Sequence, residues 1–232
     1  MTERSLTDWA PPPLPLRVSL QGRYARLEPL VRAHHEGLRA AHREDTEDAM
    51  WHYLPVGPFD DAGYKGWIDA NRVLHDPLHY AVRMEDGTLG GTLSLMRITP
   101  AAGTIETGWL TFAPRLQRTR ESTEAVYLLM KWAFKAGYRR FEWKCDAANL
   151  QSRRAAERFG LSFEGVFRQA AVVKGRNRDT AWFAAIDREW PALQEAFEAW
   201  LSPKNFDENG QQVRSLGLFT ASILVSRDPA LD

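Results

Sequence analysis

A polar turn carrying two arginines, followed at once by an apolar helical pattern, is the part of this sequence best suited to chemistry. The turn is Gln117-Arg118-Thr119-Arg120-Glu121-Ser122, and Thr123-Glu124-Ala125 opens the apolar stretch. The first turn of a helix leaves backbone N–H groups without partners, and these groups bind anions. Arg118 and Arg120 would add charge complementarity for a diphosphate. A solvated basic turn is the plainer alternative that these residues leave open.

The stretch after this turn has the apolar periodicity of a helix buried on most of its faces. Ser122 or Thr123 can cap its start, and Glu124 in the first turn suits the positive end of the helix dipole. Gly137 is the natural stop. Apolar side chains recur at helical spacing, at Ala125, Leu128, Leu129, Trp132 and Ala133.

A strand and a second helix follow this first helix. Arg140 to Cys145 alternates polar and apolar residues, which predicts a strand, and the next helix opens with Asp146-x-x-Asn149-x-x-Ser152. Asn149 can cap that helix and can also contact a ligand, and Ser152 can be an ordinary surface residue.

Composition excludes several classes of function. The chain has 232 residues, 44% hydrophobic content and 30 basic residues against 30 acidic ones, so we expect one well-cored domain that binds no nucleic acid. Cys145 is the single cysteine and the six histidines show no ligand spacing, which predicts no metal site. No signal peptide and no run of about 18 apolar residues is present, so we expect a cytoplasmic protein that does not enter membranes.

The order of predicted elements is mixed α/β. Residues 1–17 form a proline-rich arm, residues 18–201 the main domain and residues 202–232 a C-terminal extension. We expect a hairpin at 18–27, helices at 32–44, 64–74 and 191–201, strands at 80–84, 90–98, 104–112 and 140–145, and a hairpin of 163–173 with 180–186 across a turn at 174–179. The aromatic, proline-containing segment 50–59 reads as a loop that covers a pocket.

The C-terminal extension begins with a polar link at 202–210. Leu216 to Val225 could then form a last strand or an arm that docks on a partner subunit, and the sequence leaves both open. The second alternative makes a homodimer possible.

Several of these segments together resemble a known family. The residues are the strand Ile105-Glu106-Thr107-Gly108-Trp109, the turn before Thr123, and the series Asn149, Ser152, Ala156, Glu157, Gly160, Phe163, Glu164 and Gly165. From Tyr24 to about Leu201 the chain resembles GCN5-related N-acetyltransferases, in detail the branch of the RimJ and RimL type. The resemblance implies a twisted mixed sheet flanked by helices, whose central strands splay apart near Trp109 and Trp143 and admit the pantetheine arm of acetyl-CoA.

The resemblance also implies which residues bind acetyl-CoA. Leu110, Thr111 and Phe112 would offer backbone hydrogen bonds, and Asn149 would contact the pantetheine arm. The pyrophosphate would lie on Gln117, Arg118, Thr119, Arg120, Glu121, Ser122 and Thr123. The family has small residues where Arg120 and Ser122 stand here. Arg120 would therefore either fold back as a further phosphate ligand or block the site.

Acetyl transfer to an amine needs a base, an oxyanion donor and a proton for the leaving thiolate. We expect Glu106 to be the base, with its pKa raised by surrounding aromatic residues, although it could be a structural carboxylate at a sheet edge. An N–H near Leu110 would stabilise the oxyanion, and the resemblance assigns the proton donor to Ser152.

The acceptor side is less defined by the sequence. Trp51, Tyr53, Trp109 and Trp143 could line an acceptor pocket or belong to the core. Arg176 and Arg178 at a hairpin tip are either solvated or recognise the acceptor. We therefore expect an acetyl-CoA-dependent N-acetyltransferase that acts by direct attack in a ternary complex on a protein N-terminus or a small amine. The alternative is a catalytically silent CoA-binding or interaction protein of the same fold.

Overall fold

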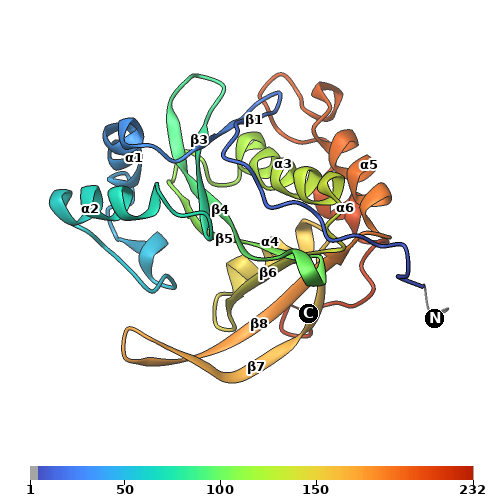
Figure 1. Ribbon diagram of the computed structural model, residues 1–232. Helices are drawn as coiled ribbons and strands as arrows, with labels where there is room; N and C mark the ends of the chain where they lie inside the picture. The colour runs from blue at the N-terminus through green and yellow to red at the C-terminus, as the bar shows by residue number, and fades with distance from the viewer. Residues whose placement is uncertain (1–4, 232) are drawn as a thin grey trace.

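One mixed sheet organises the molecule (Figure 1), in the strand order β1-β2-β3-β4-β5-β6-β8-β7. The computed structural model describes residues 5–231, so the first four residues of the predicted arm and Asp232 lie outside the described residues. The strands are β1 Leu20–Gln21, β2 Arg26–Pro29, β3 Leu78–Arg83, β4 Leu89–Thr99, β5 Thr104–Phe112, β6 Arg140–Asp146, β7 Ser162–Val173 and β8 Arg176–Ile186. Among these strands of the described residues, only β5 and β6 pair in parallel. The predicted fold class is confirmed, and the predicted domain limits stay a prediction.

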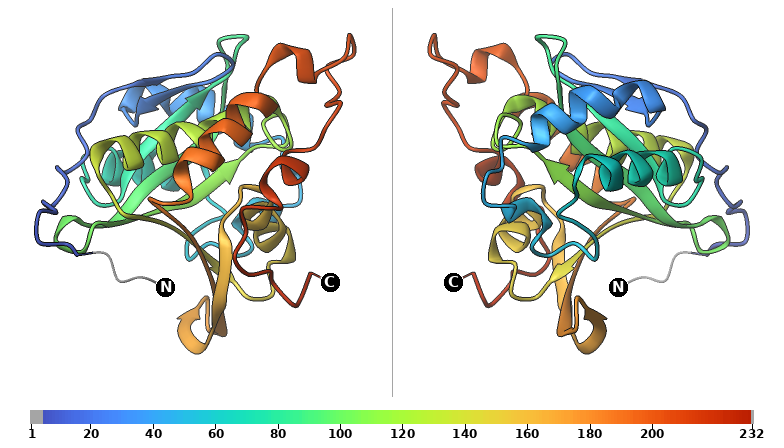
Figure 2. Two further views of the ribbon diagram at one scale, coloured as in Figure 1. Left: turned by 90° about the vertical axis from the view of Figure 1, so that its right-hand side faces the viewer. Right: turned by 90° about the vertical axis from the view of Figure 1, so that its left-hand side faces the viewer.

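Helices cover both faces of this sheet (Figure 2), with α1 and α2 on one side and α3 and α5 on the other. They are α1 His35–His42, α2 Asp61–Asn71, α3 Arg120–Ala136, α4 Leu150–Arg158, α5 Trp190–Trp200 and α6 Leu216–Thr220. Short 3₁₀ turns lie at Arg32–His34, Ala49–Trp51, Pro100–Ala102 and Pro203–Asn205. No helix within residues 5–231 is long and apolar enough to cross a membrane.

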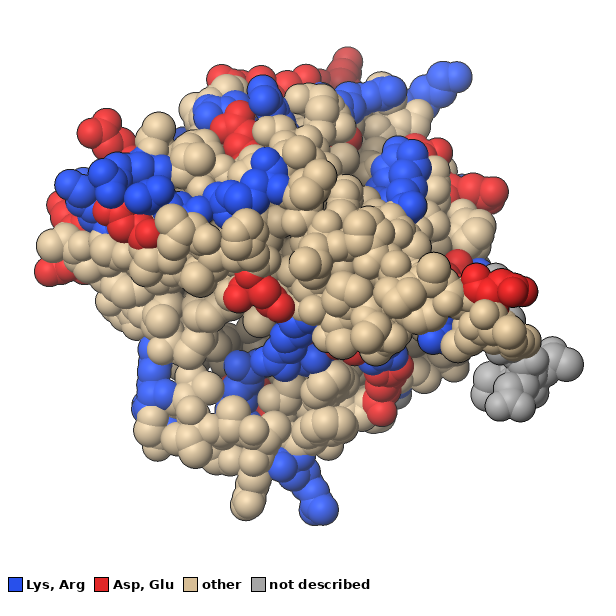
Figure 3. Space-filling view, in the orientation of Figure 1, with Lys and Arg blue, Asp and Glu red and all other residues tan. Residues whose placement is uncertain are grey.

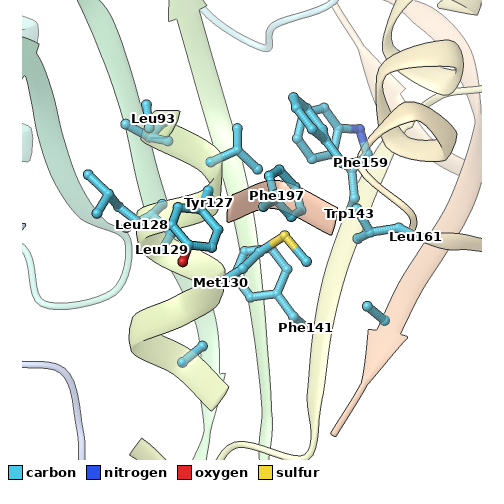
Figure 4. Close-up of a cluster of buried hydrophobic side chains, with 14 of the residues drawn as sticks. Leu93, Tyr127, Leu128, Leu129, Met130, Phe141, Trp143, Phe159, Leu161 and Phe197 are labelled. Atoms are coloured by element: carbon cyan, nitrogen blue, oxygen red, sulfur yellow. The ribbon is translucent and has the colours of Figure 1, made fainter. Parts of the chain in front are cut away.

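Two hydrophobic cores fill the space between helices and sheet. In the larger core (Figure 4), Met130 of α3, Phe141 of β6 and Phe197 of α5 meet, and all three are fully buried. The smaller core gathers aromatic side chains such as Trp51 and Tyr64 under α1 and α2. Each large apolar side chain buried in this way contributes about 1.5–3 kcal/mol.

The central strands β5 and β6 separate halfway along their length. They pair from Thr104↔Arg140 to Thr107↔Trp143 and no further. Beyond that point β5 stays with β4 and β6 stays with β8. A bulge places Trp109 and Leu110 opposite one residue of β4, with Trp109 at φ +53°. The splay predicted near Trp109 and Trp143 is confirmed.

The start of α3 lies earlier than the sequence pattern predicts. Thr119 is the N-cap, because its Oγ1 accepts a hydrogen bond from the Ser122 N–H at 3.1 Å. Ser122 and Thr123, the predicted caps, instead donate their hydroxyl protons to the Thr119 carbonyl. Three hydroxyl side chains within five residues could cap this helix, and only the surrounding packing selects the first. Gly137 ends the helix at φ +99°, as expected.

The β7–β8 hairpin has a tighter turn than predicted. Lys174 and Gly175 alone connect the strands, and Arg176 pairs with Val173. The polar run that follows the turn is strand rather than loop, since Arg176, Asn177 and Arg178 pair with Val173, Val172 and Ala171 of β7. The hairpin projects from the rest of the sheet (Figure 1).

The segment 216–225 is not a strand, so that alternative is wrong. Leu216 and Thr220, four residues apart, are both buried on one side of the short helix α6, and Thr220 Oγ1 donates to the Arg158 carbonyl at 3.1 Å. The following residues continue across the same chain, where Asp228 forms a buried ion pair with Arg153 of α4. The segment therefore packs on its own domain.

A buried carboxylate joins the N-terminal hairpin to the start of α3. Glu124 accepts hydrogen bonds from the N–H groups of Arg23, Tyr24 and Ala25 at 2.8, 2.6 and 2.7 Å. Gly22 leaves room for it, because a Cβ there would lie 2.3 Å from Glu124 Oε2. This contact fixes the N-terminal end of α3 and therefore also the polar turn at 117–122 that leads into it.

We expect Glu124→Gln to lower the free energy of unfolding by about 2–4 kcal/mol. The side-chain NH₂ group of glutamine is a donor, and it would face buried backbone N–H groups that are donors too. Urea denaturation measures this change. Glu195→Gln, an exposed change on α5, is the matched control. Equal stability of the two variants would contradict the structural role of Glu124.

Candidate functional site

A cleft of about 870 Å³ opens where β5 and β6 part. Its walls come from both strands, the start of α4, the strand β8 and the loop around residues 47–55. In Figure 3 a hollow lies between the hairpin and the body, and Lys and Arg side chains gather in it. The cleft thus joins the elements that the sequence assigned to the donor and acceptor sides.

The loop before α3 presents a cluster of free backbone donors. The N–H groups of Arg118, Thr119, Arg120 and Glu121 have no hydrogen-bond partner within residues 5–231. Arg118 takes the left-handed conformation, with φ +62°. Consecutive free N–H groups at a helix N-terminus form an anion site. The donor set therefore fits a pyrophosphate.

Ser122 and Thr123 contribute less to this surface than expected. Both side chains are buried and bond back to Thr119, so their hydroxyl groups serve the helix start. The Gln117 side chain is also occupied, since its Nε2 donates to the Phe112 carbonyl at 2.8 Å.

The Arg120 side chain does not line the cleft. Arg120 is the first residue of α3 and does not have a positive φ. The left-handed backbone conformation in this loop occurs at Arg118 instead. Its guanidinium lies 4.5 Å from the centre of the Tyr24 ring and 5.0 Å from that of Phe206. Neither ring lines the cleft. Arg120 is therefore a packing residue that ties the loop to the N-terminal hairpin and the C-terminal extension.

The open edge of β5 offers backbone groups to a ligand. Ala113 N–H donates to the Gly90 carbonyl, so by the alternation of an antiparallel ladder Leu110 and Phe112 turn their backbone groups away from β4. Leu110 also lines the cleft. Leu110 and the Phe112 N–H are therefore open to an extended amide-bearing ligand, while the Phe112 carbonyl already accepts from Gln117 Nε2.

Thr111, the third predicted residue of this strand, serves the fold. Its hydroxyl shares a hydrogen bond with Thr92 at 2.7 Å, and its carbonyl accepts from His42 Nε2 at 2.9 Å. Burial lowers the pKa of His42 to about 4, so the ring is neutral and its Nδ1 accepts from the Tyr64 hydroxyl. Thr111 thereby links β5 to the smaller core.

Glu106 is buried at the inner end of the cleft, with 3% exposure. Burial raises the pKa of its carboxyl, while the nearby Lys144 ammonium opposes that rise. The Lys144 Nζ lies 2.9 Å from Glu106 Oε2, yet Oε2 has no aligned hydrogen bond. A carboxylate that is buried, ionisable and free to accept a proton has the properties of a general base.

Lys144 was not predicted as part of the site. It bridges Glu106 and Glu142, which lies 2.7 Å away, and it sits 3.7 Å above the Trp182 ring. The signal was present in the alternation of β6, where Glu142 and Lys144 face away from buried Phe141 and Trp143. The sequence could not show that Glu106, on another strand, shares that face.

Ser152 and Asn149 are brought to the opposite wall. Asn149 caps α4, accepting the Ser152 N–H on its Oδ1 at 3.0 Å. Trp143 Nε1 donates to Ser152 Oγ at 2.9 Å, so the Ser152 oxygen is an acceptor there, and the Ser152 hydroxyl also interacts with the Cys145 thiol. Burial raises the pKa of the neighbouring Cys145 thiol to about 11, so it stays protonated and is no nucleophile.

Three of the four predicted aromatic residues line the cleft, namely Tyr53, Trp109 and Trp143. Tyr53 spans the opening, its hydroxyl donating to the Ala148 carbonyl at 3.3 Å. Trp51 does not line it. Its ring is 2% exposed and packs edge-on against Phe59 in the smaller core.

Of the two hairpin arginines, Arg178 lines the cleft and Arg176 does not. Among residues 5–231, no group of three or more His, Cys, Asp or Glu side chains could hold a metal ion.

Comparison with known proteins agrees with this geometry. The sequence model of the Acetyltransferase (GNAT) domain matches residues 25–162, which include both halves of the cleft. The chain belongs to the GNAT family of acetyltransferases, enzymes that use acetyl-CoA as the acyl donor.

Solved structures share the fold over nearly the whole chain. A GCN5-related N-acetyltransferase from Brucella melitensis is 46% identical, with a TM-score of 0.91 over 93% of this chain and 100% of that one. A probable GNAT acetyltransferase from Chromobacterium violaceum is 40% identical, with a TM-score of 0.77 over 83% of this chain and 98% of that one.

A more distant structure has the same fold. It is the Salmonella typhimurium acetyl transferase that modifies the N-terminal serine of ribosomal protein L7/L12, with 20% identity and a TM-score of 0.65 over 73% of this chain and 99% of that one. None of the curated proteins matches the chain.

We expect Arg120→Ala to weaken acetyl-CoA binding about three- to tenfold, because the loop loses a cation–π contact worth about 0.5–1 kcal/mol or more on each ring. Calorimetric titration measures this. Arg139→Ala, which removes an arginine from above the Trp9 ring, is the matched control. Tighter binding in Arg120→Ala would show that the side chain obstructs the loop.

Proposed function

We propose that this protein transfers the acetyl group of acetyl-CoA to a primary amine by direct attack within a ternary complex. One observation carries the proposal: the cleft between the parted strands is lined both by Leu110 on the open edge of β5 and by the buried residue Glu106. The strand edge that would pair with the donor and a base thus open into one space.

The donor side is built from backbone groups. The N–H groups from Arg118 to Glu121 would hold the pyrophosphate, and the open edge at Leu110 and Phe112 would pair with the amides of the pantetheine arm. Bound acetyl-CoA supplies a thioester carbonyl that is activated toward amines. Holding both reactants in one cleft contributes up to roughly 7–11 kcal/mol in well-oriented systems.

Proton transfer is assigned to two side chains on opposite walls. Glu106 takes a proton from the amine, directly or through water, since an ammonium has no lone pair for attack. Ser152, whose oxygen accepts a hydrogen bond from Trp143 Nε1, donates its hydroxyl proton to the leaving thiolate. The bulge at Trp109 and Leu110 brings backbone N–H groups to the splay, where they stabilise the developing negative charge.

The acceptor is a protein N-terminus or a small amine. The aromatic residues Tyr53 and Trp109 and the distant likeness to the L7/L12-modifying enzyme support a RimJ/RimL-like acceptor site. The alternative of a catalytically silent protein is motivated by Arg120 and Ser122, which stand where the family has small residues. The packing of Arg120 between Tyr24 and Phe206, and the hydrogen bond of Ser122 to the Thr119 carbonyl, weigh against it.

We expect Glu106→Gln to lower kcat by about 10²- to 10⁴-fold with acetyl-CoA affinity unchanged. CoA release with a broad panel of amines measures turnover, and calorimetry measures affinity. Glu142→Gln is the matched control, because it touches the same Lys144 but does not line the cleft. Equal losses in both variants would assign the effect to the charge cluster, and acetyl-CoA binding without turnover on any amine would support the silent alternative.

We expect Lys144→Met to shift the acidic limb of the pH profile of kcat/KM to higher pH. The Lys144 ammonium favours the ionised form of Glu106, so its loss raises the pKa of Glu106 further, and the base becomes protonated at a higher pH. Lys131→Met is the control, since Lys131 also pairs with a glutamate and lies above an aromatic ring, but on α3. A limb that stays in place or moves to lower pH would exclude Glu106 as the titrating base.

A further inference from the structure

The basic side chains of the cleft differ in whether they have partners. They are Arg97, Lys144, Arg154 and Arg178. Lys144 and Arg97 lie 2.9 and 3.5 Å from the Glu106 carboxylate, so their charges are balanced. Within residues 5–231, Arg154 and Arg178 have no ion-pair partner.

Arg178 is the less solvated of these two. Its Nε is buried without any hydrogen-bond partner, whereas Arg154 is exposed on α4. By contrast, the buried guanidinium of Arg153 is paired with Asp228. A buried N–H of a charged group costs free energy unless something accepts its proton. The site of Arg178 is therefore complete only with an added acceptor group.

The neighbouring carboxylate does not fill this position. Asp179 follows Arg178 directly and so points to the other face of the strand. Its Oδ1 accepts from the Gln169 N–H at 2.7 Å and from Asn177 Nδ2 at 2.9 Å. Its charge is engaged within the hairpin.

Strand register places Arg178 on the same face of the sheet as the reacting groups. Trp182 pairs with Lys144, and Arg178, four residues further along β8, shares the face of Lys144. Four residues of a strand span about 13 Å, and Arg178, Lys144 and Glu106 line one cleft, which the long arginine side chain helps to bridge. Glu106 lies on the same face, opposite Glu142. Helix α4 lies over the other face, where Phe159 at its end meets Trp143.

The hairpin that carries Arg178 is also held in position. Lys174 at its tip donates to the Trp51 carbonyl at 2.9 Å, which connects the hairpin to the loop that bears Tyr53. Figure 3 shows the Lys and Arg side chains of this region between the hairpin and the body. Arg178 therefore stands at a defined wall of the acceptor side.

We propose that the acceptor is a small amine that also carries an anionic oxygen group, a carboxylate or a phosphate, and that Arg178 binds this group. The inference rests on the proposed function, because it names the substrate class of that reaction. The guanidinium fork suits bidentate binding of such a group. Acidic Glu47 and Asp146, also in the cleft, suit the ammonium form in which the same molecule arrives.

Direct binding tests the proposal without requiring turnover. Protein saturated with CoA is titrated by calorimetry with L-phenylalanine, L-phenylalaninamide and the phosphonate analogue of phenylalanine, and with the corresponding leucine and alanine series. We expect an anionic member of a series to bind about tenfold or more tighter than its amide. The anion that binds tighter, carboxylate or phosphonate, identifies the natural group.

Variants assign the preference to a residue. We expect Arg178→Gln to abolish it and Arg178→Lys to keep part of it, because lysine retains the charge but not the fork. Arg176→Gln, an exposed change on the same hairpin outside the cleft, should leave it intact. Equal binding of acid and amide by the wild type, a preference that survives in Arg178→Gln, or one that Arg154→Gln abolishes would each overturn the proposal.

Turnover measured in parallel separates this inference from the proposed function. If amides and acids are acetylated equally well, the proposed acetyltransferase reaction stands, but the proposal that the acceptor must carry an anionic group is wrong. If binding prefers anions through Arg178 but no amine is acetylated, the anion-binding site stands and the proposed reaction is wrong.

Discussion

The end of pairing between β5 and β6 is the constraint on which the rest of the molecule depends. After Thr107 and Trp143 each strand keeps its outer neighbour and loses its inner one. Backbone groups along an unpaired inner edge need partners, because a buried N–H or C=O without one costs free energy. The bulge at Trp109 and Leu110 widens the separation. A sheet that would otherwise be continuous thus contains a slot for an extended ligand with amide groups.

Local charge balance explains how a chain of zero formal net charge builds a strongly polar cleft. Lys144 lies between Glu106 and Glu142, and its side chain is only 6% exposed. Burial favours the protonated form of Glu106, while the ammonium favours the ionised form. A base poised between these influences can both take up and release a proton. The overall charge of the sequence carries no information about such a cluster.

The C-terminal extension packs against Arg120, which stands where the family has a small residue before α3. Phe206 packs against Arg120, and the Tyr24 hydroxyl donates to the Leu201 carbonyl at 3.1 Å. Further along, the buried Asp228 holds Arg153 of α4, the helix that carries Ser152. Both walls of the cleft are therefore braced by one segment. An arginine in the loop is compatible with the fold because aromatic rings from distant segments receive it.

The sequence by itself determined the elements and the family. Period-two and helical apolar patterns predicted nearly every strand and helix up to residue 201, because such patterns record local burial. It also indicated Glu106, Asn149, Ser152 and the loop around Arg118.

Tertiary structure alone decided which of these groups meet. Strand register put Lys144 beside Glu106, and packing sent Trp51 into a core while its near neighbour Tyr53 reached the cleft. It also made 216–220 a helix and selected Thr119 as the cap. These outcomes depend on contacts between residues far apart in the chain, which no local pattern encodes.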